Sequence, residues 1–452
     1  MNRKKEIARL KKAHRSEHPV FIAVYGRRRC GKSRLLQEVV GAEDIYFVAD
    51  QRGIPLQIES MASEIARQIP GFDQASYPSW DALFKTLNSQ IKRKTRLILD
   101  EFPYLVQGSP ELPSIIQKII DNPSNKINLV ICGSSQKMMS GLVLDSHEPL
   151  YGRAAEILKV RPLEPDWLPE ALNFIGIQAV ESYAVWGGVP RYWELAKRYK
   201  DLDDAIKDLI FDRDGILHNE PGRLLLDDMR STTQAHSLLS IIANGCHRLS
   251  EIASRIGRPA SSLTRPLSNL MDLAYIKREL PFGESIKSTK RTLYKLDDPF
   301  LMFWYRFVQK NRSLLEQDLI NEVFNEFKQE FPMHVSEIWE ELARRSVTKL
   351  DVNNIKWKPA HRWWGQGVDG KKMEIDILSE SFDKRYLLFG EVKWEEGSDL
   401  KQIMNKLNYR ANNFPKKSNR KFVFAYWLKQ CDPSALSDNN IFLPHNIFPG
   451  QL

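Results

Sequence analysis

The sequence has few cysteines and no long apolar run, and each of these absences argues against a class of protein. It also has no internal repeat. Its four cysteines, Cys30, Cys132, Cys246 and Cys431, are widely spaced and form no CxxC pair. Neither a structural zinc site nor a disulfide framework is therefore expected. No apolar run approaches the ~18 residues of a membrane span, and no signal-peptide pattern is present. We therefore expect a cytoplasmic protein without a membrane span.

What the chain does have is enough apolar sequence for several cores, together with an excess of positive charge. Hydrophobic residues make up 42% of its 452 residues and charged residues 27%. This is the composition of ordinary soluble globular proteins, and the length fits about three domains. The net charge is +9, which permits a polyanionic partner such as DNA without requiring one.

Alternation of apolar strands and helical stretches predicts the fold class. The apolar runs that indicate buried strands are 21–25, 45–48, 96–99 and 127–132. Such alternation predicts an α/β fold with a parallel sheet between layers of helices. The pattern predicts five parts, which are an α/β core at 1–162, a helical region at 163–230, short helices with a strand pair at 231–296, a helical connector at 297–335 and a second α/β domain at 336–452.

The segment GRRRCGKS matches the phosphate-binding pattern GxxxxGK[ST]. It follows a predicted strand and precedes a helical run, which is the context that this motif requires. Its glycines allow backbone N–H groups to surround phosphate oxygens. Lys32 would reach the β and γ phosphates of ATP, and Ser33 would ligate Mg²⁺. The residues expected to bind the nucleotide here are Gly26, Arg27, Arg28, Arg29, Cys30, Gly31, Lys32, Ser33 and Arg34.

Residues at or near the ends of other apolar segments complete the predicted ATPase site. Asp100 ends the strand RLILD and could hold Mg²⁺, while the adjacent Glu101 could activate the attacking water. Ser134, in ICGSS, stands where many related ATPases sense the γ-phosphate, although a plain turn is the alternative. Arg153, in PLYGR, could be a cationic finger or sensor that stabilises the phosphoryl transition state. An ordinary surface arginine is the alternative for Arg153.

Residues 1–230 resemble the archaeal-type P-loop ATPases of the signalling-ATPase and AAA+ group. The start NRKKEIARL is similar to the R-x-x-E-L first helix of that family, with Arg3 and Glu6 in place and Ile7 where leucine is usual. PLYGR and GGVPRYW match later motifs of the family. The resemblance implies a lid turn in GGVP, with Pro190 near the adenine. It continues to the C-terminus through KLDDPFLMFWYRF, RWWG, EIDIL and GEVKW.

The middle of the chain has the pattern of a winged helix-turn-helix. Two apolar helical stripes are separated by Gly257, and a strand pair follows them. Residues 245–295 contain ten Lys/Arg and four Asp/Glu, so their net charge is 10 − 4 = +6. Arg258 and Arg265 would lie near the start of a recognition helix, where such helices meet DNA. DNA contact and packing within the chain both remain open interpretations.

The C-terminal segments EIWEEL, MEIDIL and GEVKW have the pattern of restriction-like nucleases, PD-(D/E)xK. Asp376 and Glu391 would bring hard oxygens to one Mg²⁺ or Mn²⁺. Lys393 would share a strand face with Glu391 and position water or stabilise the phosphorane. Glu340 would complete the metal shell or act on water, with Glu341 as its rival. There are two alternatives. The fold could be present without catalytic activity, or Glu391 and Lys393 could form only a salt bridge.

Three further features accompany these segments. Four tryptophans near the predicted site could stack on unpaired bases, although tryptophans more often form a core. These four are Trp357, Trp363, Trp364 and Trp394. Gln402 stands where some relatives carry a polar helper. The basic run KKSNRK, which begins at Lys416, could hold a phosphate backbone.

Together these features predict an ATP-binding and ATP-hydrolysing protein coupled to a magnesium-dependent deoxyribonuclease-like domain that acts on DNA. A homo-oligomer is compatible with this prediction. The rival hypothesis is a signalling-type ATPase switch of the STAND class. In that case the winged helix and the nuclease-like domain would bind a partner without catalysis.

Overall fold

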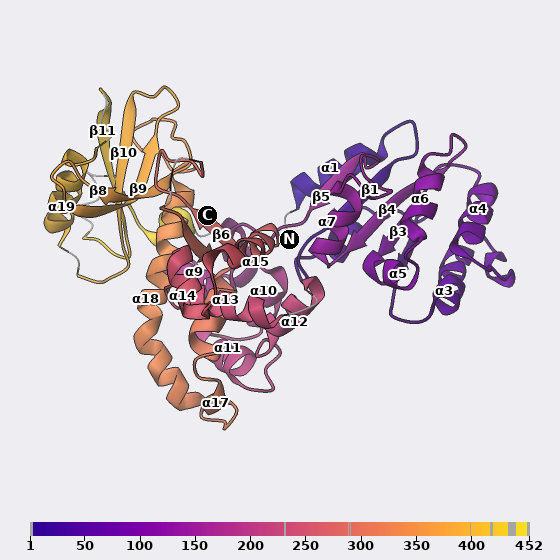
Figure 1. Ribbon diagram of the computed structural model, residues 1–452, viewed down its shortest axis with the longest axis horizontal. Helices are drawn as coiled ribbons and strands as arrows, with labels where there is room; N and C mark the ends of the chain where they lie inside the picture. Colours follow the sequence, from indigo (N-terminus) through magenta and orange to yellow (C-terminus); the bar gives the residue numbers. More distant parts are fainter. Residues whose placement is uncertain are drawn as a thin grey trace. The chain divides into compact units, whose positions relative to one another are not determined.

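The computed structural model describes residues 3–229, 232–287, 289, 291–397, 399–415, 419–432 and 440–449. The chain divides into two compact units, drawn in Figure 1. The first unit comprises Met1–Leu163, Val189–Arg191 and Gly222–Arg230. The second comprises Glu164–Gly188, Tyr192–Pro221 and Ser231–Leu452. Within the described ranges no helix is both long and apolar enough to cross a bilayer.

The first unit is built on a parallel sheet with the strand order β2-β3-β4-β1-β5. Its strands are β1 (Phe21–Tyr25), β2 (Ile45–Val48), β3 (Thr95–Asp100), β4 (Ile127–Gly133) and β5 (Glu156–Lys159). The parallel α/β sheet is therefore confirmed, and four strands lie where the apolar runs predict them. The edge strand β5 was not expected, because EILK holds only two apolar residues and pairs with a neighbour on one side alone.

Helices cover both faces of this sheet (Figure 1). One face packs against α1 (Lys4–His14) and α2 (Lys32–Gln37) through Leu10, Leu35 and Leu36. The opposite face packs against α3 (Ile54–Ala66), α4 (Trp80–Gln90), α5 (Phe102–Gly108), α6 (Leu112–Ile120) and α7 (Gln136–Leu144). Burial on both faces explains why the central strands are continuous apolar runs in the sequence.

The second unit begins with short helices and a helix–helix–hairpin segment. The first helices are α8 (Leu168–Leu172), α9 (Gly176–Trp186), α10 (Pro190–Ala196), α11 (Leu202–Ile206) and α12 (Glu220–Asp228), of which α10 and α12 also contribute residues to the first unit. They are followed by α13 (Thr233–Ala243), α14 (Leu249–Ile256), α15 (Ala260–Asp272) and the antiparallel strands β6 (Ile276–Glu279) and β7 (Leu293–Leu296). Gly257 ends α14 with a left-handed φ of 67°. This is the order of elements expected for the middle of the chain, while its role in reading DNA remains a prediction.

A long helix leads into the C-terminal sheet. The helices α16 (Pro299–Phe303) and α17 (Arg312–Leu315) precede α18 (Ile320–Ser346), which is one continuous helix. The predicted boundary between 335 and 336 therefore falls inside α18. Its Trp339 donates from Nε1 to the carbonyl oxygen of Trp427, and Trp427 in turn donates to Ser346 Oγ. These buried bonds hold α18 against the sheet.

The C-terminal sheet is mixed, with the order β12-β11-β10-β9-β8. Its elements are β8 (His361–Gln366), β9 (Lys372–Glu380), β10 (Tyr386–Lys393), α19 (Leu400–Asn412), β11 (Lys421–Leu428), β12 (Ile441–Phe442) and α20 (Pro444–Ile447). Ile403 and Leu407 of α19 pack on Leu387 and Phe389 of β10. An α/β domain was expected here, but the tryptophan-rich strand β8 was not.

Candidate active sites

The phosphate loop between β1 and α2 has a shape that only glycine permits at two positions. Gly26 has a φ of +155°, and a Cβ there would lie 2.2 Å from the carbonyl oxygen of Val160. Gly31 has a φ of +83° just before α2. Larger side chains are therefore disfavoured at both positions. The non-glycine Arg29 also takes a left-handed φ of 66°, as expected for a loop that turns its amides inward.

The segment that resembles the first helix of archaeal-type ATPases anchors this loop. Arg3 forms an ion pair of 3.0 Å with Glu6. Its Nη2 donates to the carbonyl oxygens of Cys30, at 3.0 Å, and Arg161, at 2.7 Å. One guanidinium thus joins the loop to the chain that follows β5. Burial raises the pKa of the Cys30 thiol, which makes Cys30 a neutral packing residue.

Lys32 and Asp100 are both buried within the candidate ATPase site. Lys32 Nζ donates to the carbonyl oxygen of Arg27 at 3.3 Å. The hydroxyl of Tyr46 donates to Asp100 Oδ2 at 2.6 Å and also contacts Ser33. One phenol oxygen therefore bridges Ser33 and Asp100, the two predicted Mg²⁺ ligands. A hydroxyl and a carboxylate are hard oxygen ligands of the kind that Mg²⁺ prefers.

Glu101 and Ser134 meet at the ends of β3 and β4. The amide of Glu101 donates to Asp100 Oδ1 at 2.9 Å, and the hydroxyl of Ser134 donates to Glu101 Oε1 at 3.1 Å. Glu101 has a left-handed φ of 52°, which costs a non-glycine residue about 1–2 kcal/mol. Strain of this kind tends to occur at functional sites. The structure thus brings Asp100, Glu101 and Ser134 together.

The remaining predicted nucleotide contacts are spread more widely. Arg34 pairs at 3.0 Å with Glu38 on the exposed side of α2. Pro190 is buried at the first position of α10 and belongs to the first unit. Their contact with the base or the phosphates stays a prediction.

Arg153 lies near the end of the sheet at which β1 begins. Its guanidinium binds Asp121 in a bidentate pair, with Nε–Oδ1 and Nη2–Oδ2 distances of 2.9 Å. Ala155, two residues later, donates to the carbonyl oxygen of Phe21 where β1 begins, whereas the phosphate loop follows the other end of β1. The ion pair with Asp121 agrees with the alternative of an ordinary surface arginine. A role of Arg153 as a finger or sensor stays a prediction.

Two aspartates of α12 reach the nucleotide loops, and sequence reasoning missed them. Arg28 Nη1 lies 3.4 Å from Asp227 Oδ2, and the amide of Gln136 donates to Asp228 Oδ1 at 2.8 Å. Gln136 begins α7 directly after the predicted γ-phosphate sensor segment. Acidic side chains are unfavourable in the last turn of a helix. The pair DD at the end of α12 was therefore a usable signal that these carboxylates have partners elsewhere.

In the C-terminal sheet, β9 and β10 bring Asp376 and Glu391 to the same face. The antiparallel register ends with Gly390 opposite Ile377. Continued by one residue, it would set Glu391 opposite Asp376, and the charges of these two carboxylates do interact. Residues directly opposite each other in such a pair lie on one face. Asp376 Oδ2 accepts the amide of Val392 at 3.0 Å. Asp376 is 9% exposed and Glu391 1% exposed, so both carboxylates are buried.

Glu391 forms ion pairs with two cations, whereas Asp376 is repelled by neighbouring carboxylates. Lys393 Nζ lies 3.0 Å from Glu391 Oε1, and Arg410 of α19 contacts Oε2. Burial and the nearby charges of Glu391 and Glu340 raise the pKa of Asp376 to about 7. Repulsion of this kind is relieved by a divalent cation, and these oxygens suit Mg²⁺. In the described part of the chain no three acidic, histidine or cysteine side chains converge to hold a metal. Because Lys393 and Arg410 already contact both oxygens of Glu391, metal binding would require Glu391 to exchange one of these cations.

Arg410 was missed by sequence reasoning, although a signal for it existed. The inward stripe of α19 is made of Ile403, Leu407 and Ala411. Arg410 lies next to this stripe, at i+3 from Leu407 and i+7 from Ile403. A charged residue at the edge of an apolar stripe needs a partner on the sheet, and here that partner is Glu391.

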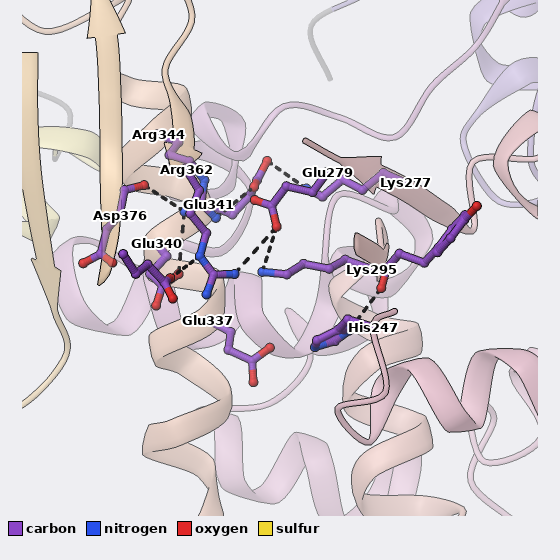
Figure 2. A network of polar contacts seen from close by, with 12 residues as sticks. His247, Lys277, Glu279, Lys295, Glu337, Glu340, Glu341, Arg344, Arg362 and Asp376 are labelled. Carbon is purple, nitrogen blue, oxygen red and sulfur yellow. Dashed lines mark hydrogen bonds and ion pairs between the residues drawn. The ribbon is translucent and has the colours of Figure 1, made fainter. Parts of the chain in front are cut away.

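Helix α18 supplies Glu340 and the buried Arg344 (Figure 2). Arg344 Nη1 donates to the carbonyl oxygen of Asp376 at 3.2 Å and lies 3.6 Å from Glu340 Oε2. Glu341 also contacts Arg344, at 3.4 Å, but it is drawn to Lys277 of β6, at 3.0 Å. The two rival glutamates thus separate, with Glu340 toward Asp376 and Glu341 toward the β6–β7 hairpin. This geometry favours Glu340 as the third carboxylate.

The β6–β7 hairpin uses its charges within the second unit, as Figure 2 shows. Besides the Lys277–Glu341 pair, Glu279 meets Lys295 at 3.2 Å and Arg362 of β8 at 3.7 Å. The expected wing is therefore docked by ion pairs on β8 and α18. For this hairpin the ion pairs favour packing within the chain, which is one of the two interpretations that the sequence leaves open, while DNA contact stays a prediction.

Most of the tryptophans are core residues. Trp357, Trp363 and Trp394 are buried, and Trp394 packs against Trp339 with ring centroids 5.5 Å apart. Base stacking on these three rings is therefore excluded. Gln402 lies on α19, whereas Lys416 and Lys417 fall outside the described residues.

Comparisons with known proteins agree with the first unit. Residues 1–194 match the family model described as an ATPase domain predominantly from Archaea. Residues 304–406 match the model described as archaea bacterial proteins of unknown function. A solved Walker-type ATPase of Pyrococcus abyssi has 21% identity and a TM-score of 0.52, over 68% of this chain and 95% of that chain. That likeness shows the fold alone.

An uncharacterised protein of Methanocaldococcus jannaschii is 32% identical over 423 residues, which cover 91% of each chain. The chain therefore belongs to the family of this Methanocaldococcus jannaschii protein, and its N-terminal part is a P-loop ATPase domain of the archaeal type.

Proposed function

We propose that this protein is an ATP-controlled, metal-dependent nuclease that acts on DNA. The observation that carries the proposal is the convergence of Asp376, Glu391 and Lys393 on one face of a sheet, with Glu340 adjoining from α18. Two buried carboxylates can hold a metal ion, and an ammonium can stabilise the charge that develops on a phosphodiester during hydrolysis. The ATPase domain supplies the nucleotide-dependent control.

In the ATPase site, Lys32 would contact the transferred phosphate, and Ser33 with Asp100 would hold Mg²⁺. Mg²⁺ neutralises charge on the phosphates when it is bound. Glu101, held by Ser134, would orient and deprotonate the attacking water. The α12 aspartates contact both the phosphate loop and the sensor segment. They would therefore respond to whether the γ-phosphate is present.

In the nuclease-like site, Asp376 and Glu391 would hold the divalent cation, and Glu340 would complete its shell or act on the water. The cation supplies an activated water and neutralises the scissile phosphate. Burial opposes the charge of Lys393, but Glu391 raises the pKa of Lys393 above its usual value. Lys393 would therefore stay an ammonium. Released from Glu391, it would donate a hydrogen bond to the phosphate.

The second candidate function is a switch without cleavage, in which the nuclease-like domain only binds a partner. The ion pairs on both oxygens of Glu391 favour it, because they satisfy this carboxylate without a metal. The two hypotheses differ in one measurable property, which is the breaking of phosphodiester bonds.

Plasmid cleavage tests the proposal. The purified full chain is incubated with supercoiled DNA, with Mg²⁺ or Mn²⁺, with and without ATP, and in parallel with EDTA. We expect nicked or linear DNA only with a metal, at a rate that ATP changes. Intact DNA under all conditions, together with measurable ATP hydrolysis, would support the switch instead.

The helix pair α14–α15 gives a separate prediction about DNA binding. Arg258 and Arg265 are exposed. If they contact phosphates, replacing both by alanine should flatten the slope of log K against log salt by about 1–2 units. A matched control replaces Lys356 and Lys384, which are exposed charges of the C-terminal domain. An unchanged slope for the arginine variant with altered ATPase activity would mean that α15 packs within the chain instead.

A further inference from the structure

A groove of about 650 Å³ lies between α19 and the start of β9. Its basic lining residues are Lys372, Lys401, Lys406 and Arg410. The single carboxylate of the lining is Asp399, which accepts the amides of Lys401, at 3.0 Å, and Gln402, at 3.3 Å. That carboxylate is engaged as the N-cap of α19. The groove therefore presents a net positive surface and is complementary to a polyanion.

An exposed aromatic ring stands in this groove. Tyr409 is 46% exposed, and its hydroxyl donates to Asp369. The ammonium of Lys371 lies 6.0 Å from the centre of the ring. The tyrosine is therefore tethered at its hydroxyl, beside cations, with much of its ring accessible. Exposed aromatics among basic side chains are the surfaces on which unpaired bases stack.

The groove is continuous with the nuclease-like site through Arg410. Arg410 lines the groove and also contacts Glu391 Oε2. A phosphate that binds Arg410 would compete for this guanidinium. One oxygen of Glu391 would then become available to a cation. A polyanion in the groove is thus chemically linked to the acidic site.

We propose that this groove binds an unpaired segment of a nucleic-acid strand. Phosphates of the strand contact Lys372, Lys406 and Arg410, and a base stacks on Tyr409. The volume of the groove lies within the range of ordinary ligand pockets. It admits a few nucleotides of one strand rather than a duplex. The inference deepens the proposed nuclease function by naming its substrate class, but binding to the groove does not depend on cleavage.

The first test measures the binding of a dye-labelled single strand and of the matching duplex by fluorescence anisotropy, with the full chain in EDTA. The variant Lys372→Ala/Lys406→Ala is compared with the control Lys356→Ala/Lys384→Ala, which removes the same charge from the same domain. We expect the groove variant to bind the single strand about 10-fold more weakly. Its salt slope should fall by about 1–1.5, since two phosphate contacts are lost. Equal effects of both variants, or tighter binding of the duplex, would overturn the proposal.

The second test separates stacking from charge. Tyr409→Leu should weaken binding of the single strand about 10-fold, while Tyr409→Phe, which keeps the ring, should bind nearly as well as the wild type. Both variants lose the bond to Asp369, so a role that depends on this bond alone would affect them equally. Equal weakening in the two would therefore contradict stacking. Thermal unfolding verifies that each variant is folded.

The outcomes also distinguish the two proposals. If the wild type binds the single strand through the groove but cleaves no DNA, the nuclease function fails and the groove stands. If plasmid cleavage is metal-dependent but the groove variants bind and cut as the wild type does, the groove proposal fails and the nuclease function stands.

Discussion

Glu101→Gln should lower the rate of ATP hydrolysis at least ~100-fold while ATP binding stays close to that of the wild type. The glutamine keeps an oxygen that can accept the hydrogen bond of Ser134, so the local structure should persist. It cannot take a proton from the attacking water, so the chemical step should slow. Phosphate release at saturating ATP measures the rate, and equilibrium binding of a fluorescent ATP analogue measures affinity.

Lys32→Ala is the comparison for this experiment. It should lose nucleotide binding, or nearly so, because it removes the buried ammonium that is proposed to contact the phosphates. The two variants thus separate binding from chemistry at adjacent parts of one site. Hydrolysis at the wild-type rate by Glu101→Gln would mean that another group is the base.

Asp376→Asn should abolish plasmid cleavage while leaving ATP hydrolysis and DNA binding largely intact. Asparagine retains an oxygen that can accept the amide of Val392, so the sheet should stay closed. It lacks the negative charge that a divalent cation requires of its ligands. Lys393→Ala should abolish cleavage as well, because the ammonium facing the site is lost. Nicking of supercoiled plasmid with Mg²⁺ and with Mn²⁺ measures both variants.

The matched control is Glu396→Gln, which removes an exposed carboxylate three residues after Lys393. Glu396 pairs only with Lys429, at 2.8 Å, among the ion pairs of the described residues. This variant should cleave as the wild type does. Cleavage by Asp376→Asn at the wild-type rate would assign the activity to another site or a contaminant, and would leave the switch hypothesis in place.

The sequence alone was sufficient where a function depends on consecutive residues. The phosphate loop needs glycine at positions 26 and 31 and a lysine at position 32, and all three lie within one short loop of consecutive residues. Alternation along β10 likewise puts Glu391 and Lys393 on one face, because side chains on a strand repeat every two residues. The four buried strands of the first sheet were visible as apolar runs for the same local reason.

Tertiary structure decided which distant groups meet. The sequence could not tell that Arg153 lies near the end of the sheet at which β1 begins, because the unrecognised β5 fixes that position. The sequence left Glu341 as a rival to the preferred Glu340, and only the fold shows that the charge of Glu340 acts on Asp376 while Glu341 meets Lys277. The same holds for Arg410, whose contact with Glu391 joins a helix to a strand.

The physical reason is the range of the interactions. Backbone dihedral preferences and side-chain alternation act over a few residues. Their effects can therefore be predicted from a short sequence motif. Ion pairs such as Arg28–Asp227 join residues far apart in the sequence, and only the packing of helices on sheets brings them within reach. The sequence thus determined the local chemistry of each candidate site, while the fold determined the charges that surround it.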